Sequence, residues 1–433
     1  MPRPSTRPLT FVDAFAGCGG LSLGLMQAGW TGRFAIERDK FAFATLKKNL
    51  LSKGVRHRYV WPRWLPKEPI GIVELLDKYR RDLEVFAGTV DVLVGGPPCQ
   101  GFSSAGRRKH DDPRNQLFAS YLNLVEILKP KAVLIENVRG FTLDFSTGDE
   151  IKNFSQALKA RLSDDYTVHE QLLDLSIFGV PQARTRYFVL AFRSELNVPN
   201  PFEHLLGRLP SFLRSLRLTA PVSSGSAISD LEVGRSGRQP STDSTGFEET
   251  RYTGPLTHYQ KLMNAGCEIP TDLRLARHAD DIAERFQEII ELSHAAGRLN
   301  TSIGAEMRAR FGLKKMALRV LDPDRPSPTI TSMPDDLLHY SEPRTLTVRE
   351  NARLQTFPDW YSFQGKYTTG GHRRKQEVPR FTQVANAVPP LVARAIGETL
   401  TDLLKAKPTK AAAVGRKARS SPHGVEQGTE IRA

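Results

Sequence analysis

Apolar residues gather in short runs along residues 1–193, and helix-like stretches separate these runs. Six runs are predicted to form β-strands, at residues 10–15, 33–37, 91–94, 132–136, 167–173 and 186–192. Residues 116–128 place their apolar side chains on one face at helical spacing. Nearly continuous apolar strands separated by helices are typical of an α/β fold with a mostly parallel sheet covered on both faces. Ligands of such sheets bind at the carboxyl ends of the strands.

The pattern changes after residue 194. Residues 220–246 are rich in Ser and Gly, show little periodicity and are predicted to form a loop. Residues 280–298 are predicted to form a helix whose inward side chains are Ile282, Phe286, Ile289 and Ile290. A further helix, packed on a core, is predicted for residues 384–404. Beyond residue 405, small and basic residues cannot bury enough surface to fold, so we expect a disordered tail.

The length and charge of the chain narrow the possible functions. A chain of 433 residues favours two domains. The net charge is +14, of which residues 405–433 supply +5 through seven Lys/Arg and two Asp/Glu, so the rest of the chain carries +9. A positive body suits a polyanion such as nucleic acid, because neutralised phosphates release counterions. A basic solvated surface explains the charge equally well.

No run approaches the roughly 20 apolar residues that span a bilayer, and the N-terminus lacks the apolar core of a secretory signal. We therefore expect a cytoplasmic protein. The three cysteines, Cys18, Cys99 and Cys267, are too few and too scattered for a disulfide framework. They also lack the paired spacing of a zinc site, so we expect no metal.

A glycine-rich turn follows the first predicted strand, in the sequence Asp-Ala-Phe-Ala-Gly-Cys-Gly-Gly at residues 13–20. The next strand ends in Glu37, an acid that can bind the two hydroxyls of a ribose. Together they indicate a nucleotide-like cofactor, either a nicotinamide dinucleotide or S-adenosylmethionine, although a purely structural turn would look similar. The spacing of Gly17, Gly19 and Gly20 differs from the dinucleotide pattern and disfavours a dehydrogenase.

Cys99 follows the third strand, in the sequence Gly-Gly-Pro-Pro-Cys-Gln-Gly-Phe-Ser at residues 95–103. A lone cysteine is usually a small buried hydrophobe. One held by two prolines at a ligand-binding edge is a candidate nucleophile, because covalent catalysis requires rigid positioning. The loop that follows contains Arg107, Arg108 and Lys109 and could close over a phosphate backbone.

The stretch 95–103 is similar to the signature of DNA (cytosine-5)-methyltransferases. Further motifs of that family follow in its usual order, at residues 136–138, 182–186, 349–358 and 383–390. The resemblance implies a Rossmann-like, mostly parallel sheet in a methyltransferase domain (1–193) and a second, smaller target-recognition domain (194–380). It also implies a helix that returns to the first domain (381–404) before the basic tail (405–433).

The resemblance assigns catalytic roles to Cys99, Glu136, Arg184 and Arg186. The Cys99 thiolate adds to carbon 6 of cytosine, so that carbon 5 can attack the methyl group of S-adenosylmethionine. Glu136 holds the exocyclic amine and ring nitrogen 3. Arg186, with Arg184 nearby, holds the carbonyl oxygen and lowers the pKa of Cys99. A structural ion pair is the alternative interpretation of Glu136 and Arg186.

The same resemblance implies a cofactor site in which Phe15 stacks on the adenine and Asn386 anchors the methionine part. Its residues are Phe15, Gly17, Gly19, Glu37, Ile72, Pro98, Leu117, Asn386 and Ala387. The family usually has Gly-Asp-Ile where this chain has Pro-Ile-Gly-Ile at residues 69–72. The acid that would hold the adenine amino group is therefore missing or replaced by Glu68, while Ile72 supplies an apolar wall.

Double-stranded DNA is the substrate that the resemblance implies, with base readout by the variable stretch 194–341. The predicted DNA contacts are Ser103, Arg107, Arg108, Lys314, Lys315, Arg373 and Arg374. For the basic residues 308–319 a solvated helical face is an equal alternative. Because the stack hides carbon 5 and carbon 6, the target base must flip out. The sequence specifies neither the DNA target nor the side chain that fills the resulting gap.

Two other functions fit parts of the pattern. An RNA cytosine methyltransferase would have the same fold, but the long variable stretch and Gln-Gly-Phe after Cys99 favour DNA. A sequence-specific DNA-binding protein with an inactive catalytic domain is disfavoured by the joint presence of Cys99, Glu136, Arg184, Arg186 and Asn386. We therefore expect a monomeric bacterial modification enzyme of a restriction-modification system, with or without a separate restriction endonuclease.

Overall fold

The computed structural model describes residues 7–97, 113–142, 145–147, 150–152, 154–368 and 377–406. Its centre is a six-stranded sheet in the order β2-β1-β3-β4-β9-β7. The strands are β1 (Thr10–Ala14), β2 (Thr31–Ile36), β3 (Val92–Gly95), β4 (Ala132–Asn137), β7 (Tyr166–Asp174) and β9 (Thr185–Arg193). All six predicted strands are confirmed, with ends shifted by at most two residues.

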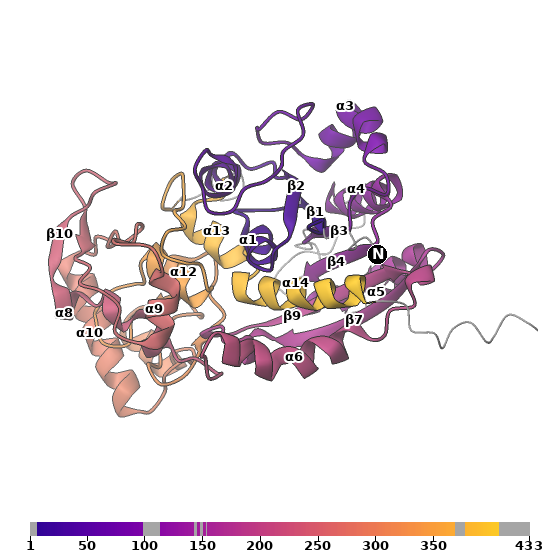
Figure 1. Cartoon of the computed structure of the whole chain (residues 1–433). Helices are drawn as coiled ribbons and strands as arrows, with labels where there is room; N and C mark the ends of the chain where they lie inside the picture. The colour runs from indigo at the N-terminus through magenta and orange to yellow at the C-terminus, as the bar shows by residue number, and fades with distance from the viewer. Residues whose placement is uncertain are drawn as a thin grey trace, which may run out of the picture.

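The sheet is mostly parallel, as predicted. Strands β2, β1, β3 and β4 run parallel, whereas β9 is antiparallel to β4 and β7 is antiparallel to β9. Successive residues of β1 point to opposite faces, so Phe11 and Val12 enter different hydrophobic clusters. The cluster of Phe11 includes side chains of α1 (Gly20–Gln27), α6 (Pro201–Ser215) and α14 (Pro390–Lys405), and that of Val12 includes α3 (Ile72–Val85) and α4 (Pro113–Leu128). Helices therefore cover both faces (Figure 1).

The C-terminal helix packs against α1, next to the first strand of the sheet (Figure 1). The approach is close enough that a Cβ on Gly24 would lie 2.3 Å from the carbonyl oxygen of Pro390. The single helix predicted at 384–404 is wrong, because the chain forms α13 (Arg380–Asn386) and then α14. Pro389 and Pro390 have no N–H to donate, so the helix is interrupted there.

Most residues between α6 (Pro201–Ser215) and α12 (Val348–Leu354) form a second region, at the left of Figure 1, whereas α6 itself packs on α14 and β7. Helix α10 (Asp280–Ala295) confirms a predicted helix, and Phe286, Ile289 and Ile290 are buried in its cluster. The predicted loop at 220–246 is partly wrong, because it contains α7 (Ser224–Ile228), α8 (Val233–Ser236) and β10 (Arg238–Pro240), which pairs with β11 (Glu248–Thr250). Elements of three to five residues are too short to carry a periodic pattern.

The remaining elements are short. They are α2 (Lys40–Leu46), α5 (Phe154–Leu162), α9 (His258–Asn264), α11 (Ala305–Arg310), α12 (Val348–Leu354), β5 (Phe145–Thr147), β6 (Glu150–Lys152), β8 (Gln182–Ala183), β12 (Arg319–Val320), β13 (Ser327–Pro328) and β14 (Leu337–Leu338). No helix in the described ranges is both long and apolar enough to cross a membrane.

A buried ionic cluster joins α12 to the second region. The guanidinium group of Arg353 lies 3.1 Å from Asp230 and 2.5 Å from Asp359, and all three side chains are inaccessible to solvent. These carboxylates raise the pKa of Arg353 above its usual value, against the effect of burial. The motif at 349–358 therefore has a structural role, because its Arg353 fixes the segment around Asp230 to the core.

Candidate active site

A cavity of about 440 Å³ lies at the carboxyl ends of β1 to β4. Each of these strands contributes one residue at its carboxyl end to the cavity wall. These residues are, for β1 to β4 in order, Phe15, Glu37, Gly96 and Glu136. This position agrees with the expectation that ligands bind where parallel strands end. We call this space the central cavity.

The glycine-rich turn after β1 is held by a carboxylate from the neighbouring strand. One oxygen of Glu37 accepts a hydrogen bond from the backbone N–H of Gly17 at 2.9 Å, and the other accepts from Asp39 at 2.7 Å. Gly17 and Gly19 have φ values of 56° and 93°, which favour glycine. Burial raises the pKa of Glu37. Glu37 thus shapes the turn and presents a carboxylate to the cavity.

Most of the predicted cofactor residues line the central cavity. They are Phe15, Gly17, Glu37, Ile72, Leu117, Asn386 and Ala387. Gly19 is not among the lining residues, and a Cβ there would lie 2.9 Å from the hydroxyl of Tyr361, so it serves packing beneath the turn. Replacement of the missing acid by Glu68 is wrong, because Glu68 is exposed and does not line the cavity. Ile70, Gly71 and Ile72 form that wall instead.

Glu136 and Arg186 lie on the antiparallel strands β4 and β9. The Nε atom of Arg186 lies 3.1 Å from Oε1 of Glu136, and both side chains are largely buried. Burial lowers the pKa of Arg186, and Glu136 opposes this shift. A Cβ on Gly96 would lie 3.3 Å from Oε2 of Glu136, so this glycine keeps the space around the carboxylate open.

Arg184 is the second arginine of the cavity wall, and only 3% of it is exposed. Its Nε and Nη1 atoms have no hydrogen-bond partner among the described residues. Burial lowers its pKa to about 9, and the charge of Arg186 adds to this shift. A buried cation with unused donors is unfavourable unless a ligand supplies acceptors. Arg184 is therefore suited to bind a carbonyl or an anion in the cavity.

A segment far along the chain completes the wall, and the sequence pattern did not reveal it. Strand β13 pairs with β8, directly before Arg184, and brings Ile330, Thr331 and Ser332 to the cavity. The N–H of Ile330 donates to Oε1 of Gln182 at 3.1 Å. Two residues of β13 carry no periodic signal, so this pairing was not predictable from the sequence.

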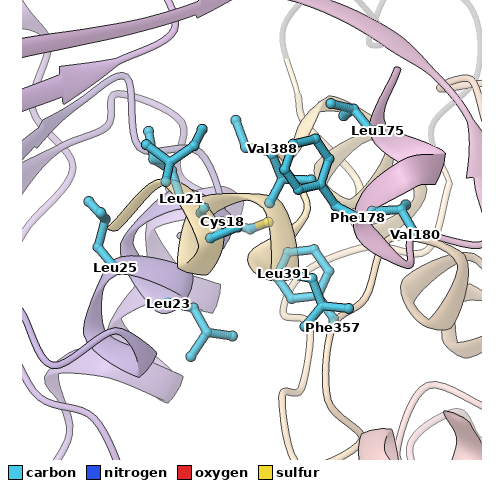
Figure 2. Packing of buried hydrophobic residues seen from close by; sticks show 14 of the residues in the cluster. Cys18, Leu21, Leu23, Leu25, Leu175, Phe178, Val180, Phe357, Val388 and Leu391 are labelled. Atoms are coloured by element: carbon cyan, nitrogen blue, oxygen red, sulfur yellow. The ribbon is translucent and has the colours of Figure 1, made fainter. Parts of the chain in front are cut away.

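Two of the three cysteines are in described segments, and Cys18 is buried beneath the turn. Figure 2 shows it among apolar side chains that include Leu21, Val388 and Leu391. Cys18 contributes to the cavity lining, but only 1% of it is exposed and burial raises the pKa of its thiol to about 12, which disfavours the thiolate that a nucleophile needs. Cys267 is partly exposed and does not line the central cavity.

Several predicted site residues lie outside the described residues. They are Pro98, Cys99, Ser103, Arg107, Arg108, Arg373 and Arg374. Gly96 and Pro97, which directly precede Pro98, line the central cavity. The carbonyl oxygen of Pro97 accepts a hydrogen bond from the Asn137 side chain at 3.0 Å.

The two predicted DNA contacts in the described chain differ in their surroundings. Lys314 is exposed, whereas Nζ of Lys315 lies 2.7 Å from carboxylate oxygens of both Asp335 and Asp336. Because two acids already balance its charge, Lys315 is less suited than Lys314 to bind a phosphate.

Comparison with known proteins identifies the family. A family model described as C-5 cytosine-specific DNA methylase matches residues 9–402. The type II methyltransferase M.DdeI of Desulfomicrobium norvegicum is 30% identical over 407 residues, which cover 91% of this chain and 88% of the relative. M.AgeI of Thalassovita gelatinovora is 31% identical over 466 residues, which cover 90% of this chain and 98% of the relative.

A solved E. coli structure, described as a prophage-encoded DNA modification methyltransferase, shares the fold. It is 24% identical, with a TM-score of 0.60, and the match covers 92% of this chain and 99% of that one. The chain therefore belongs to the C-5 cytosine-specific DNA methylase family and is a DNA cytosine-5 methyltransferase of the bacterial restriction-modification type.

Proposed function

We propose that this enzyme transfers a methyl group from S-adenosylmethionine to carbon 5 of a flipped-out cytosine in a specific double-stranded DNA sequence. The observation that carries the proposal is that one cavity holds both halves of such a site. Phe15 and Glu37 line it together with Glu136, Arg184 and Arg186. A methyl donor and a base can therefore meet there without passing through solvent.

The donor end of the cavity suits S-adenosylmethionine. Glu37 provides carboxylate oxygens for ribose hydroxyls, and each oxygen can accept a second hydrogen bond beyond the one from the backbone. Phe15 offers an aromatic face, and the apolar side chains of Ile72 and Leu117 suit an adenine ring. When bound, S-adenosylmethionine supplies an electrophilic methyl group on a sulfonium centre.

The base end of the cavity suits cytosine. A cytosine presents a carbonyl oxygen beside ring nitrogen 3 and an amino group, which are an acceptor and a donor on one edge. Arg186 would hold the carbonyl, as the resemblance implies, together with donors of Arg184 that have no partner among the described residues. Glu136 has acceptor capacity for the amino group and for a protonated nitrogen 3. These hydrogen bonds strengthen as negative charge develops on the ring, so they stabilise the addition step.

Cys99 is the proposed nucleophile. Its thiolate would form a bond with carbon 6, and the electron pair of the carbon 5–carbon 6 double bond would then attack the methyl group, whose bond to sulfur breaks so that S-adenosylhomocysteine leaves with that bond's electron pair. Loss of the proton from carbon 5 restores that double bond and expels the thiolate. Arg184 and Arg186 favour the thiolate form, because nearby cations lower a thiol pKa.

The positive net charge of the chain favours binding to the phosphates of a DNA backbone. The predicted phosphate contacts are Lys314, Arg107, Arg108, Arg373 and Arg374. We infer that the protein acts as a monomer in the cytoplasm, where bacterial DNA lies, and protects that DNA from a separate restriction endonuclease. The second region lies within residues 194–380, the proposed target-recognition domain, whereas α6 of that range packs on α14 and β7.

The proposal is tested by expression in a bacterial host that lacks cytosine methylation, followed by bisulfite sequencing of its DNA. We expect 5-methylcytosine at one recurring sequence, and none when Cys99→Ser replaces the wild type at equal expression. Unmodified DNA with the wild type, or equal methylation by the variant, would contradict the proposed function.

A further inference from the structure

Met316 is a large apolar side chain of the second region that is exposed to solvent. It is 69% exposed, and among the described residues with large apolar side chains only Val85, at 78%, exposes more. It belongs to the segment Gly-Leu-Lys-Lys-Met-Ala at residues 312–317, which we call the 312–317 loop. Exposure of a large apolar side chain to water is unfavourable, and on a basic segment it can indicate a binding surface.

Both ends of the 312–317 loop are anchored. The cluster that contains Ile289 and Ile303 holds the loop at both ends. Phe311 and Leu313 pack in it at the first end, and Leu318 packs in it at the second. The backbone N–H of Leu313 donates to Arg308 at 2.8 Å, and that of Ile303 donates to the carbonyl of Leu318 at 3.0 Å. Met316 is therefore exposed at the tip of a loop whose two ends are fixed by packing and hydrogen bonds.

An ion pair and a hydrogen bond connect this loop to the wall of the central cavity. Nζ of Lys315 lies 2.7 Å from Oδ1 of Asp336, and Oδ2 of Asp336 accepts a hydrogen bond from Oγ1 of Thr331. Thr331 lines the cavity together with Arg184 and Arg186. Asp336 is nearly buried, so the connection is shielded from water. Met316 therefore directly follows a lysine that is connected, through Asp336 and Thr331, to the wall of the cavity that we propose receives the flipped base.

We propose that Met316 enters the DNA helix and occupies the space that the target cytosine leaves. This inference rests on the proposed function. A flipped base leaves unstacked neighbours, and apolar wedges such as Met stabilise that state by contact with them. An unbranched thioether suits this task, because it is flexible and makes favourable sulfur–aromatic contacts. Lys314, exposed two residues away, can bind the adjacent phosphate, while Lys315 holds the loop in place.

The test compares two duplexes of about 25 base pairs that contain the sequence mapped by bisulfite sequencing. In one the target cytosine is paired with guanine, and in the other it lies opposite an abasic site. For Met316→Ala we expect kcat/KM on the paired duplex to fall by on the order of tenfold or more, because flipping a paired base is unfavourable. On the abasic duplex, where no pair has to open, the variant should stay within about twofold of the wild type.

Two variants serve as controls. Val85→Ala removes an equally exposed apolar side chain at the end of α3, about 20 Å along the helix from the cavity residue Ile72, and should change neither rate. Met316→Leu keeps an apolar wedge and should restore most of the rate on the paired duplex. Equal losses on both duplexes for Met316→Ala, or no loss on either, would overturn the role of Met316. No transfer by the wild type to either duplex would overturn the proposed function and this inference with it.

Discussion

Glu136 and Arg186 face each other from antiparallel strands, with 3.1 Å between Oε1 and Nε, inside a cavity that Arg184 also lines with donors that have no partner among the described residues. The pair keeps two largely buried charges compensated while the cavity is empty of a base. Arg184 forms no ion pair within the described chain, and burial, with the charge of Arg186, lowers its pKa to about 9. The cavity wall therefore suits a ligand that has an acceptor for the donors of Arg184 and a donor for the carboxylate of Glu136.

Replacement of Glu136 by Gln should slow methyl transfer by about 10²–10⁴-fold, the usual range for a group that assists proton transfer. The amide keeps the shape of the side chain but loses the charge that stabilises a protonated ring nitrogen. Single-turnover transfer of a labelled methyl group measures the effect. Affinity for S-adenosylmethionine should remain within about twofold, since Glu136 lies at the other end of the cavity. A rate equal to that of the wild type would leave Glu136 with a purely structural role.

Glu37→Gln should weaken S-adenosylmethionine binding by on the order of tenfold, because hydrogen bonds to a charged acceptor are stronger than those to an amide. Isothermal titration calorimetry measures the change. Glu68→Gln is the matched control, since Glu68 is exposed and does not line the cavity. If Glu68→Gln weakened binding as much as Glu37→Gln, the assignment of the donor end would be wrong.

Arg353→Leu should lower the free energy of unfolding by about 3–5 kcal/mol, because Asp230 would remain as a buried, uncompensated charge and Asp359 would keep only Arg349, 3.9 Å away. Urea denaturation followed by circular dichroism gives the value. Arg208→Leu removes a more exposed arginine that pairs with Asp402 and Glu398, and should change stability by only about 0–1 kcal/mol. Similar losses in the two variants would refute the importance of the buried cluster.

Asp13 should make stability depend on pH between about 4 and 7. Burial raises the pKa of this carboxyl group from 3.8 to about 7, although a hydrogen bond from Ser22 opposes the shift. The folded state then holds a proton that the unfolded state releases, so this group lowers stability as pH rises through that window, by up to about 1.4 kcal/mol per pH unit.

In Asp13→Asn that contribution is absent. The difference in unfolding free energy, variant minus wild type, should therefore rise from pH 4 to pH 7 and level off above pH 7. Denaturation midpoints measured across this range test the expectation. A difference that is independent of pH would mean that Asp13 titrates normally in the fold.

The central strands of the sheet were predictable because β1, β3 and most of β4 and β9 are buried on both faces, and such strands form continuous apolar runs in the sequence. All residues of β3 are buried, for example, and none interrupts the run. The break at Pro389 and the elements between 224 and 250 were not predicted correctly. A helix pattern continued across the prolines, and the short elements depend on tertiary contacts such as the ion pair of Asp230 with Arg353.

The candidate site was predictable where a motif ends a strand, as with Glu136 or the turn at Gly17. Its remaining wall depends on contacts between distant segments. Ile330 bonds to Gln182 across 148 positions of the chain, and only this pairing brings Thr331 beside Arg184. No local pattern encodes such a contact. The exposure of Met316 likewise follows from the packing of its neighbours and not from its own sequence context.

The central claim is that a cysteine adds to cytosine during methyl transfer. A duplex with 5-fluorocytosine at the mapped target, incubated with enzyme and S-adenosylmethionine, tests it directly, because fluorine cannot leave carbon 5 as a proton does. Denaturing electrophoresis and mass spectrometry should detect a complex of protein, DNA and one methyl group, linked through Cys99 and absent with Cys99→Ser. Failure to form this complex with an enzyme that methylates normal DNA, or a link through another residue, would contradict the mechanism.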